Sequence, residues 1–89
     1  MTLFVGEGCP HCAAVEQLLE ERGFYQSCSI EVKEIYFDRQ NAEELNKLFD
    51  AHKIPLNQRF IPTLLAEGKL YIGGNSIREY ISGLETEES

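Results

Sequence analysis

Cys9 and Cys12 stand where a short apolar run gives way to a helical pattern. Residues 3–5 read Leu-Phe-Val, and two of the next three residues are glycines, which predicts a short buried strand that ends in a turn. Pro10 suits the first position of a helix. The apolar residues that recur after it on one helical face are Ala14, Val15, Leu18 and Leu19. The spacing therefore predicts that the cysteine pair lies at the junction of a first strand and a first helix.

The middle of the chain predicts a second strand and a second helix. Residues 30–37 are rich in β-branched and aromatic side chains, which favour extended structure. Asn41, with Glu44 three residues later, resembles a capped helix start. The apolar stripe behind it comprises Ala42, Leu45, Leu48 and Phe49. His52 closes this stripe, so it is interpreted as a packed or helix-ending residue rather than a ligand.

The last third of the chain predicts a hairpin and a third helix. Residues 63–66 and 70–72 flank a Glu-Gly-Lys turn, which is a hairpin pattern. Ser76 and Glu79 form a capping box for a final helix. The apolar face of that helix comprises Ile77, Tyr80, Ile81 and Leu84. The aromatic residues expected in the core or on a sheet face are Phe24, Tyr25, Tyr36 and Tyr71.

These elements run strand, helix, strand, helix, strand, strand, helix. A strand–helix–strand unit implies two parallel strands with a right-handed crossover, and the hairpin adds an antiparallel pair. We therefore expect an α/β fold, a four-stranded mixed sheet flanked by helices. A chain of 89 residues forms one domain. We place that domain at residues 1–84, followed at residues 85–89 by an acidic tail that is expected to be flexible.

Charge and cysteine content exclude several classes of protein. The net charge of −7 argues against a nucleic-acid partner, and no apolar run approaches the roughly 20 residues of a membrane span. The three cysteines are an odd number, unlike the even sets of secreted disulfide-rich domains. The N-terminus shows no signal-peptide pattern. We expect a reducing, cytoplasmic location, where a close cysteine pair is more often catalytic or metal-binding than structural.

The position of the cysteine pair favours thiol–disulfide exchange. With Pro10 first in the helix, Cys9 becomes the N-cap residue, and its sulfur faces unpaired N–H groups and the positive end of the helix dipole. Such sites lower the pKa of a cysteine to about 3.5–7.5. Cys12 lies three residues on, on the same helical face, within reach for a disulfide. One thiol is thus activated and the other is held beside it.

A zinc site is the alternative for these cysteines. Cys9, Cys12 and Cys28, with either His11 or His52, could supply four ligands. A second Cys-x-x-Cys or a spaced histidine pair would support that interpretation, and the sequence has neither. Redox chemistry is therefore favoured, and no bound metal is expected. Cys28 is then a bystander that could be glutathionylated.

Three motifs in order make the chain resemble a glutaredoxin over nearly all of residues 1–84. Residues 9–12 read Cys-Pro-His-Cys, where glutaredoxins typically carry Cys-Pro-Tyr-Cys. Residues 60–62 read Phe-Ile-Pro, where the family has Thr-Val-Pro with a cis proline. Gly73 and Gly74 match the glycine pair that follows the fourth strand. The resemblance implies a thioredoxin-like β-α-β-α-β-β-α fold and a dithiol oxidoreductase that uses glutathione as cosubstrate, with no bound prosthetic group.

The resemblance also implies where substrates bind. A cis bond between Ile61 and Pro62 would turn the Ile61 backbone towards the sulfurs, leaving its N–H and C=O free to pair with a substrate. The glycine pair allows close backbone approach. The helix start at Asn75 and Ser76 would then offer N–H groups to the γ-glutamyl carboxylate of glutathione.

Two departures from the family pattern bear on glutathione. Glutaredoxins commonly carry a lysine three residues before the first cysteine, and here that residue is Gly6, followed by acidic Glu7. The acidic residues usual after the glycine pair are also replaced. Arg59 or Gln58 could supply a carboxylate contact from the other side. A thioredoxin-reductase-linked electron donor is therefore an alternative to a glutathione-linked one.

His11 occupies the place of the usual tyrosine. An imidazole in the first helical turn can donate a hydrogen bond to the Cys9 thiolate. A stabilised thiolate favours the reduced form, which makes a cysteine pair more oxidising. We therefore expect a less reducing potential than tyrosine at this position would give.

The expected function is reduction of protein disulfides and glutathione mixed disulfides by a monomeric, glutaredoxin-like enzyme. Cys9 is the expected nucleophile and Cys12 the resolving thiol, with Pro10 and His11 completing the catalytic motif. The alternative from another class is a thioredoxin-like module that binds a partner without turnover. Neither nucleic acid nor a membrane is expected among the partners.

Overall fold

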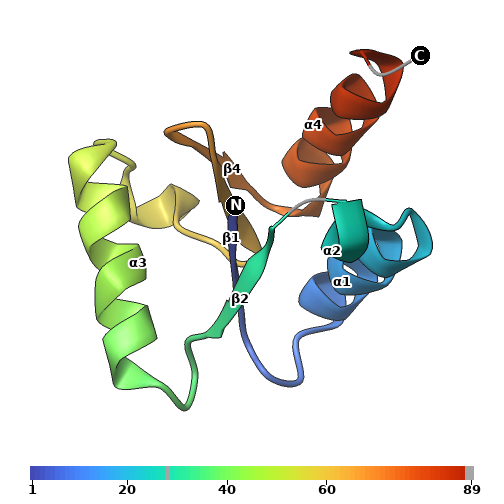
Figure 1. Ribbon diagram of the computed structural model, residues 1–89. Coiled ribbons are helices and arrows are strands. Elements are labelled where there is room, and N and C mark those ends of the chain that lie inside the picture. The colour runs from blue at the N-terminus through green and yellow to red at the C-terminus, as the bar shows by residue number, and fades with distance from the viewer. Residues whose placement is uncertain (28, 88–89) are drawn as a thin grey trace.

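The computed structural model describes residues 1–27 and 29–87 and contains a sheet between layers of helices (Figure 1). The strands are β1 (Thr2–Val5), β2 (Glu31–Glu34), β3 (Thr63–Ala66) and β4 (Lys69–Ile72). The helices are α1 (Pro10–Glu21), α2 (Phe24–Ser27), α3 (Arg39–Ala51), the 3₁₀ helix η1 (Leu56–Gln58) and α4 (Gly74–Glu87). The short helix α2 has no counterpart in the sequence-based prediction. Cys28 lies outside the described residues.

The four strands are ordered β2-β1-β3-β4. β1 pairs in parallel with β2, and the crossover between them contains α1. β3 pairs antiparallel with both β1 and β4. The predicted α/β architecture with a mixed four-stranded sheet is confirmed.

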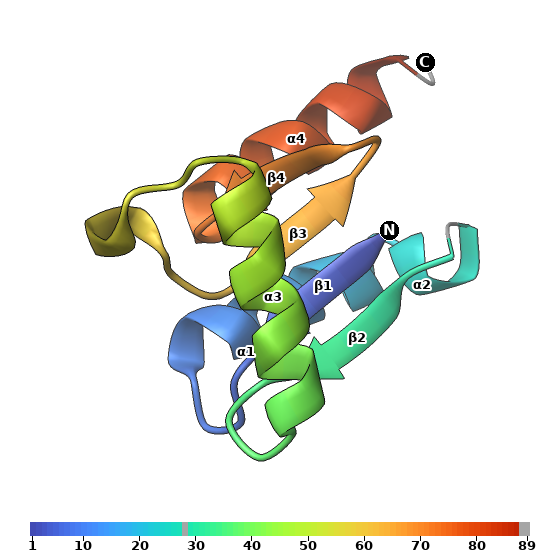
Figure 2. The same ribbon diagram turned by 90° about the vertical axis from the view of Figure 1, so that its left-hand side faces the viewer.

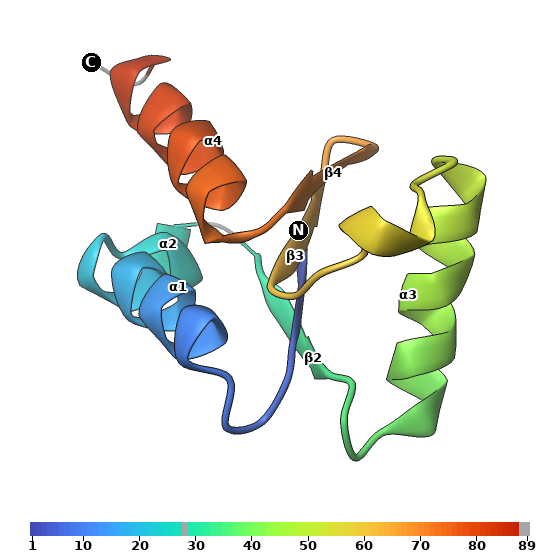
Figure 3. The same ribbon diagram turned by 180° about the vertical axis from the view of Figure 1, so that it is seen from behind.

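Helices cover both faces of the sheet. α3 lies across one face, and α1, α2 and α4 lie on the other (Figures 1, 2 and 3). β1 shows the alternation that this requires: Leu3 and Val5 join the core cluster of α1 and α4, whereas Phe4 packs with residues of α3. None of the described helices is long and apolar enough to cross a membrane.

The second strand is shorter than predicted, ending at Glu34 instead of residue 37. The N–H groups of Tyr36 and Phe37 donate to the Glu34 carboxylate, at 2.8 and 2.7 Å. A side chain thus takes backbone donors that would otherwise continue the strand. Tyr36 is 59% exposed and Phe37 is 80% exposed, so the assignment of Tyr36 to the core or a sheet face was wrong.

Two helices begin earlier than the capping patterns predicted. The N-cap of α3 is Asp38, whose carboxylate accepts from the Asn41 N–H at 3.2 Å. Asn41 is therefore inside the helix, because Asp38, three positions upstream, caps it instead. α4 begins at Gly74, and the Ile77 N–H donates to the Gly73 carbonyl at 3.2 Å. Ser76 consequently lies in the first turn and does not start a capping box.

The last helix also continues past its expected end at Leu84. α4 extends through Glu87, so its backbone includes three residues that the sequence pattern assigned to the acidic tail. Residues 88 and 89 lie outside the described part of the chain. The division into a domain at 1–84 and a tail at 85–89 stays a prediction.

Candidate active site

Cys9 lies at the end of the loop that joins β1 to α1, as the N-cap residue of the helix. Its backbone is extended (φ −82°, ψ 116°), with Pro10 at the helix start, as predicted. The Cys9 N–H donates to the Gly6 carbonyl at 3.1 Å, and the Cys9 carbonyl accepts from the Ala13 N–H at 3.0 Å. The side chain makes no close capping bond. The N–H groups in the first turn of α1 therefore act on the sulfur through longer contacts and through the helix dipole.

The two thiols are free and differ sharply in exposure: Cys9 is partly exposed, whereas Cys12 is 1% exposed. Partial burial opposes ionisation of Cys9. The Cys12 thiol, which donates to the Cys9 sulfur, and the nearby N–H groups of Cys12 and His11 outweigh this effect and lower the pKa of Cys9 below its ordinary value of 9.0. Burial, reinforced by the hydrogen bond to Cys9 and its negative charge, raises the pKa of Cys12 to about 12.

This asymmetry divides the work between the two sulfurs. An accessible sulfur with a lowered pKa is a nucleophile, because the thiolate is the reactive form. A buried sulfur with a raised pKa stays protonated and can stabilise its neighbour by donating a hydrogen bond. Cys9 can therefore attack an external disulfide while Cys12 stays protonated.

Glu34 of β2 ties the active-site loop to the segment that follows β2. Its Oε2 accepts from the Glu7 N–H at 2.9 Å and from the Tyr36 N–H at 2.8 Å, and its Oε1 accepts from the Phe37 N–H at 2.7 Å. Partial burial opposes ionisation, but these backbone donors lower the pKa of Glu34 below its ordinary value of 4.5. The ionised carboxylate thus holds two loops together beside Cys9.

Replacing Glu34 with glutamine is expected to lower the melting temperature at neutral pH. Glutamine keeps one acceptor oxygen where the carboxylate has two, so the three N–H donors cannot all be satisfied. Because the pKa of Glu34 is lowered by folding, its stabilisation is present above pH 4.5 and is lost as the pH falls through the folded-state value. The measurement is the melting temperature from pH 7 to pH 3.

The difference between wild type and Glu34→Gln should shrink as the pH falls below 4.5. Glu31→Gln is the matched control. It removes a carboxylate from the same strand, and the Glu31 side chain is 70% exposed. A Glu34→Gln difference that stays constant down to pH 3 would contradict the proposed role of the ionised carboxylate.

Three grooves surround the cysteine motif, with volumes of about 660, 500 and 440 Å³. The helix groove, which is the largest, includes His11, Ile61, Gly73, Gly74, Asn75, Ser76 and Arg78. The acidic groove includes Glu7, Cys9, Pro10, Glu16 and Glu34. The aromatic groove includes Cys9, Tyr36, Phe49, Arg59, Phe60 and Ile61. Cys9 borders the acidic and aromatic grooves, so a group bonded to its sulfur can extend into either.

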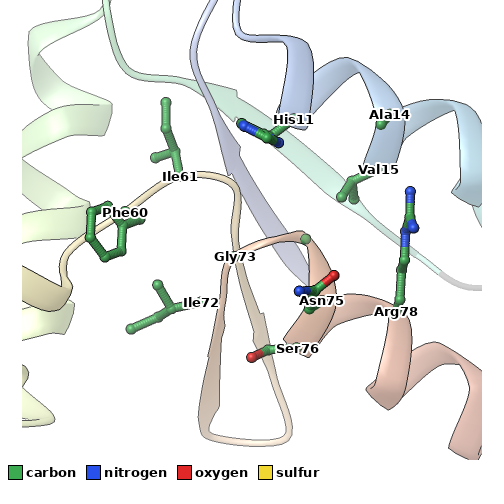
Figure 4. A pocket seen from close by; sticks show the side chains of 11 residues that line it. His11, Ala14, Val15, Phe60, Ile61, Ile72, Gly73, Asn75, Ser76 and Arg78 are labelled. Atoms are coloured by element: carbon green, nitrogen blue, oxygen red, sulfur yellow. The ribbon is translucent and has the colours of Figure 1, made fainter.

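The helix groove gathers most of the residues that the resemblance assigned to glutathione. Gly73 precedes α4, whose first residues are Gly74, Asn75 and Ser76, and Ile61 borders the same groove from the loop before β3 (Figure 4). The bond between Ile61 and Pro62 is cis, as expected. Pro62 itself is buried. Residues far apart in the sequence thus line one groove next to the cysteine motif.

His11 contributes to the site in two ways. Its backbone N–H favours the negative charge on Cys9. Its imidazole is exposed and borders the helix groove, where it lies across from Ile61 (Figure 4). Within the described residues, His11 thus acts on Cys9 through its backbone N–H, whereas the sequence-based expectation assigned this role to the imidazole.

Arg59 lies in the aromatic groove, apart from the helix groove. Its guanidinium pairs with the Asp50 carboxylate at 2.8 Å, and its Nε donates to the Ile54 carbonyl at 3.0 Å. The group also lies 5.5 Å from the centre of the Phe49 ring. Arg59 is thus held by protein groups on several sides, which reduces its capacity to bind a substrate carboxylate.

Arg78 is a cation of the helix groove that sequence reasoning missed. It follows Gly74 by four residues, one turn along α4, and its side chain extends beside Val15 (Figure 4). The signal was present, since residues four apart share a helix face. It was hidden because the predicted capping box placed the helix start later than Gly74.

The metal alternative has no geometric support in the described part of the chain. No three His, Cys, Asp or Glu side chains of residues 1–27 and 29–87 form a potential metal-binding group. His52 is the C-cap residue of α3, which matches its interpretation as a helix-ending residue. Cys28 lies outside the described residues, so its predicted bystander role stays a prediction.

In the comparison with protein families, the chain matches the model described as Glutaredoxin over residues 1–72. The matched part contains the Cys9–Cys12 motif and the Ile61–Pro62 bond, and it ends one residue before Gly73. Searches of curated proteins and of solved structures found no match. The family match thus covers the sheet and the cysteine motif, whereas the groove residues of α4 lie beyond it.

Proposed function

The chain belongs to the glutaredoxin family, which has the thioredoxin-like fold, and on that basis we propose that it reduces disulfides with Cys9 and Cys12. The substrates are protein disulfides, glutathione mixed disulfides or both. The observation that supports this proposal is the opposite shift of the two cysteine pKa values, lowered for Cys9 and raised to about 12 for Cys12. A reactive thiol hydrogen-bonded to a protected one suits a two-step exchange.

In the first step the Cys9 thiolate attacks one sulfur of the substrate disulfide. The bond to Cys9 Sγ forms as the substrate S–S bond breaks, and the second substrate sulfur leaves as a thiolate. The N–H groups of His11 and Cys12 favour the negative charge on Cys9 before the attack. A substrate disulfide can approach Cys9 from the solvent, because Cys9 is partly exposed.

In the second step Cys12 resolves the mixed disulfide. Forming that disulfide removes the negative charge on Cys9, which is one cause of the raised pKa of Cys12. Cys12 then passes its proton to the leaving thiolate or to solvent, and its sulfur attacks Cys9 Sγ. A Cys9–Cys12 disulfide forms as the substrate departs. The substrate has gained the two electrons that the cysteine pair has lost. One of its two protons comes from Cys12, and the other comes from solvent, to which Cys9 released its own proton on ionising.

Glutathione is the proposed cosubstrate that restores the dithiol. Two glutathione thiols supply two electrons and two protons and leave as glutathione disulfide. In the helix groove, the backbone N–H groups at the start of α4 and the Arg78 guanidinium both favour a carboxylate. On the opposite side of Cys9, the three glutamates of the acidic groove disfavour a tripeptide with two carboxylates. Thioredoxin reductase is therefore the second candidate electron source.

A coupled assay on a small glutathione mixed disulfide tests this proposal. NADPH oxidation is followed with glutathione and glutathione reductase, and separately with thioredoxin reductase. The proposal predicts a rate proportional to the protein in the glutathione system. Turnover with thioredoxin reductase alone would support the second candidate. Turnover in neither system would favour a thioredoxin-like binding module.

Replacing His11 with tyrosine is expected to make the cysteine pair more reducing. The backbone N–H of His11 favours the Cys9 thiolate and is kept in the variant, so this experiment isolates the contribution that we expect from the imidazole N–H, a polar donor in the first turn of α1. The measurement is the reduction potential of wild type and His11→Tyr in glutathione redox buffers. A wild-type potential equal to or lower than that of the variant would show that the side chain does not act in this way.

A further inference from the structure

The Tyr36 ring packs against the backbone of the active-site loop. A Cβ atom built on Gly6 would lie only 2.6 Å from Tyr36 Cζ and from Ile61 Cδ1. The volume into which a side chain at position 6 would project is therefore filled by Tyr36 and Ile61. Gly6 is buried in consequence, and it precedes Cys9 by three residues. The ring thus forms part of the wall next to the reactive sulfur.

The backbone of Tyr36 is fixed where the ring can serve as a wall. Its N–H is bound by Glu34 Oε2, which also binds the Glu7 N–H of the active-site loop. Despite these contacts the residue remains 59% exposed. One part of the ring is therefore packed on Gly6, and a large part is open to a ligand in the groove.

The aromatic groove suits an uncharged, apolar group. Tyr36 and Phe60 both line this groove, and Phe60 is 60% exposed. The single charged residue among its described lining residues, Arg59, is paired with Asp50. The acidic groove on the other side of Cys9 carries three carboxylates instead. An apolar arm of a substrate disulfide bonded to Cys9 is consequently expected to turn towards Tyr36 and Phe60.

We propose that Tyr36 is a specificity-determining residue, which binds an aromatic or large apolar side chain adjacent to the reactive cysteine of a protein disulfide. The inference rests on the proposed function, because it requires that Cys9 attacks such a disulfide. Among the described lining residues the one cation, Arg59, is paired with Asp50 and is not free for the carboxylates of glutathione, so the groove serves the protein arm of the substrate. Ring-to-ring contact with Tyr36 supplies the preference.

Two blocked peptides that differ in one residue test the proposal. Each is an uncharged tetrapeptide with one cysteine, joined by a disulfide to 2-mercaptoethanol, and the residue before the cysteine is phenylalanine or serine. Reduced protein is mixed with each peptide, and the second-order rate constant of peptide release is measured by chromatography. Wild type is expected to favour the phenylalanine peptide by about five- to tenfold. The ratio of the two rate constants is the readout.

The Tyr36→Ala variant is expected to bring this ratio close to one, whereas Tyr36→Phe should keep it, because the phenyl ring remains. Tyr25→Ala is the matched control, since Tyr25 is a 36% exposed tyrosine of α2 that lies outside the aromatic groove. Phe60→Ala, which removes the other exposed aromatic side chain of the aromatic groove, should lower the ratio as well. The pH profile of Cys9 alkylation should be the same in all variants, which separates binding from a change in thiol reactivity.

The outcomes separate this inference from the proposed function. If wild type reacts with neither peptide, the proposed function and the role of Tyr36 both fail. If wild type reacts with both but Tyr36→Ala keeps the wild-type ratio, only the role of Tyr36 is overturned. A shift of the Cys9 alkylation profile in Tyr36→Ala would likewise overturn it in favour of a structural effect on the loop.

Discussion

Replacing Cys9 with serine is expected to reduce disulfide exchange to the uncatalysed rate. A serine hydroxyl does not ionise near neutral pH, so the variant lacks the nucleophile that begins the reaction. The fold should survive, because serine is a favourable N-cap residue and its oxygen can accept from the N–H groups at the start of α1. The measurements are turnover of a glutathionylated peptide and the melting temperature of the variant.

Cys12→Ser is the informative partner of that experiment. It keeps the exposed nucleophile and removes the resolving thiol, so a second glutathione molecule must release the substrate from Cys9. We expect it to retain turnover on glutathione mixed disulfides and to lose most of its activity on protein disulfides. Full activity in Cys9→Ser, or equal losses in both variants on the mixed disulfide, would contradict the assigned roles.

Alkylation of the reduced protein with iodoacetamide at pH 7 is expected to modify Cys9 and spare Cys12. A pKa of about 12 instead of 9.0 lowers the thiolate fraction at pH 7 by about 1,000-fold. Cys12 is also only 1% exposed, and this burial slows the reaction further. Cys9 should react with a pH profile that inflects below 9.0, because its pKa is lowered. Mass spectrometry of the resulting peptides assigns the modified sites.

The same experiment on Cys9→Ser tests whether the two sulfurs are coupled. Without the negative charge on Cys9, burial is left as the main cause of the raised pKa of Cys12, so that pKa should fall below about 12. Alkylation of Cys12 should therefore accelerate in Cys9→Ser. An unchanged rate would show that burial alone protects Cys12 and that the resolving step gains nothing from loss of the Cys9 charge.

Local patterns in the sequence predicted most of the fold because they reflect interactions within one element. The periodicity of Val15 and Leu19 marks the buried face of α1, and Pro10 marks its start. The predictions failed where a second group competes for a helix cap or for the backbone N–H donors of a strand. Asp38 caps α3 in place of Asn41, and the Glu34 carboxylate ends β2 by taking backbone donors.

The candidate site divides in the same way. The sequence alone determined that Cys9 caps a helix with Cys12 one turn behind, because capping and helical spacing depend on neighbours in the chain. The tertiary structure decided what surrounds the pair. The register of β1 with β2 pairs Val5 with Glu34, and only this pairing brings the Glu34 carboxylate to the active-site loop and the Tyr36 ring onto Gly6. Contacts between residues about thirty positions apart depend on strand pairing, for which a single sequence carries no local signal.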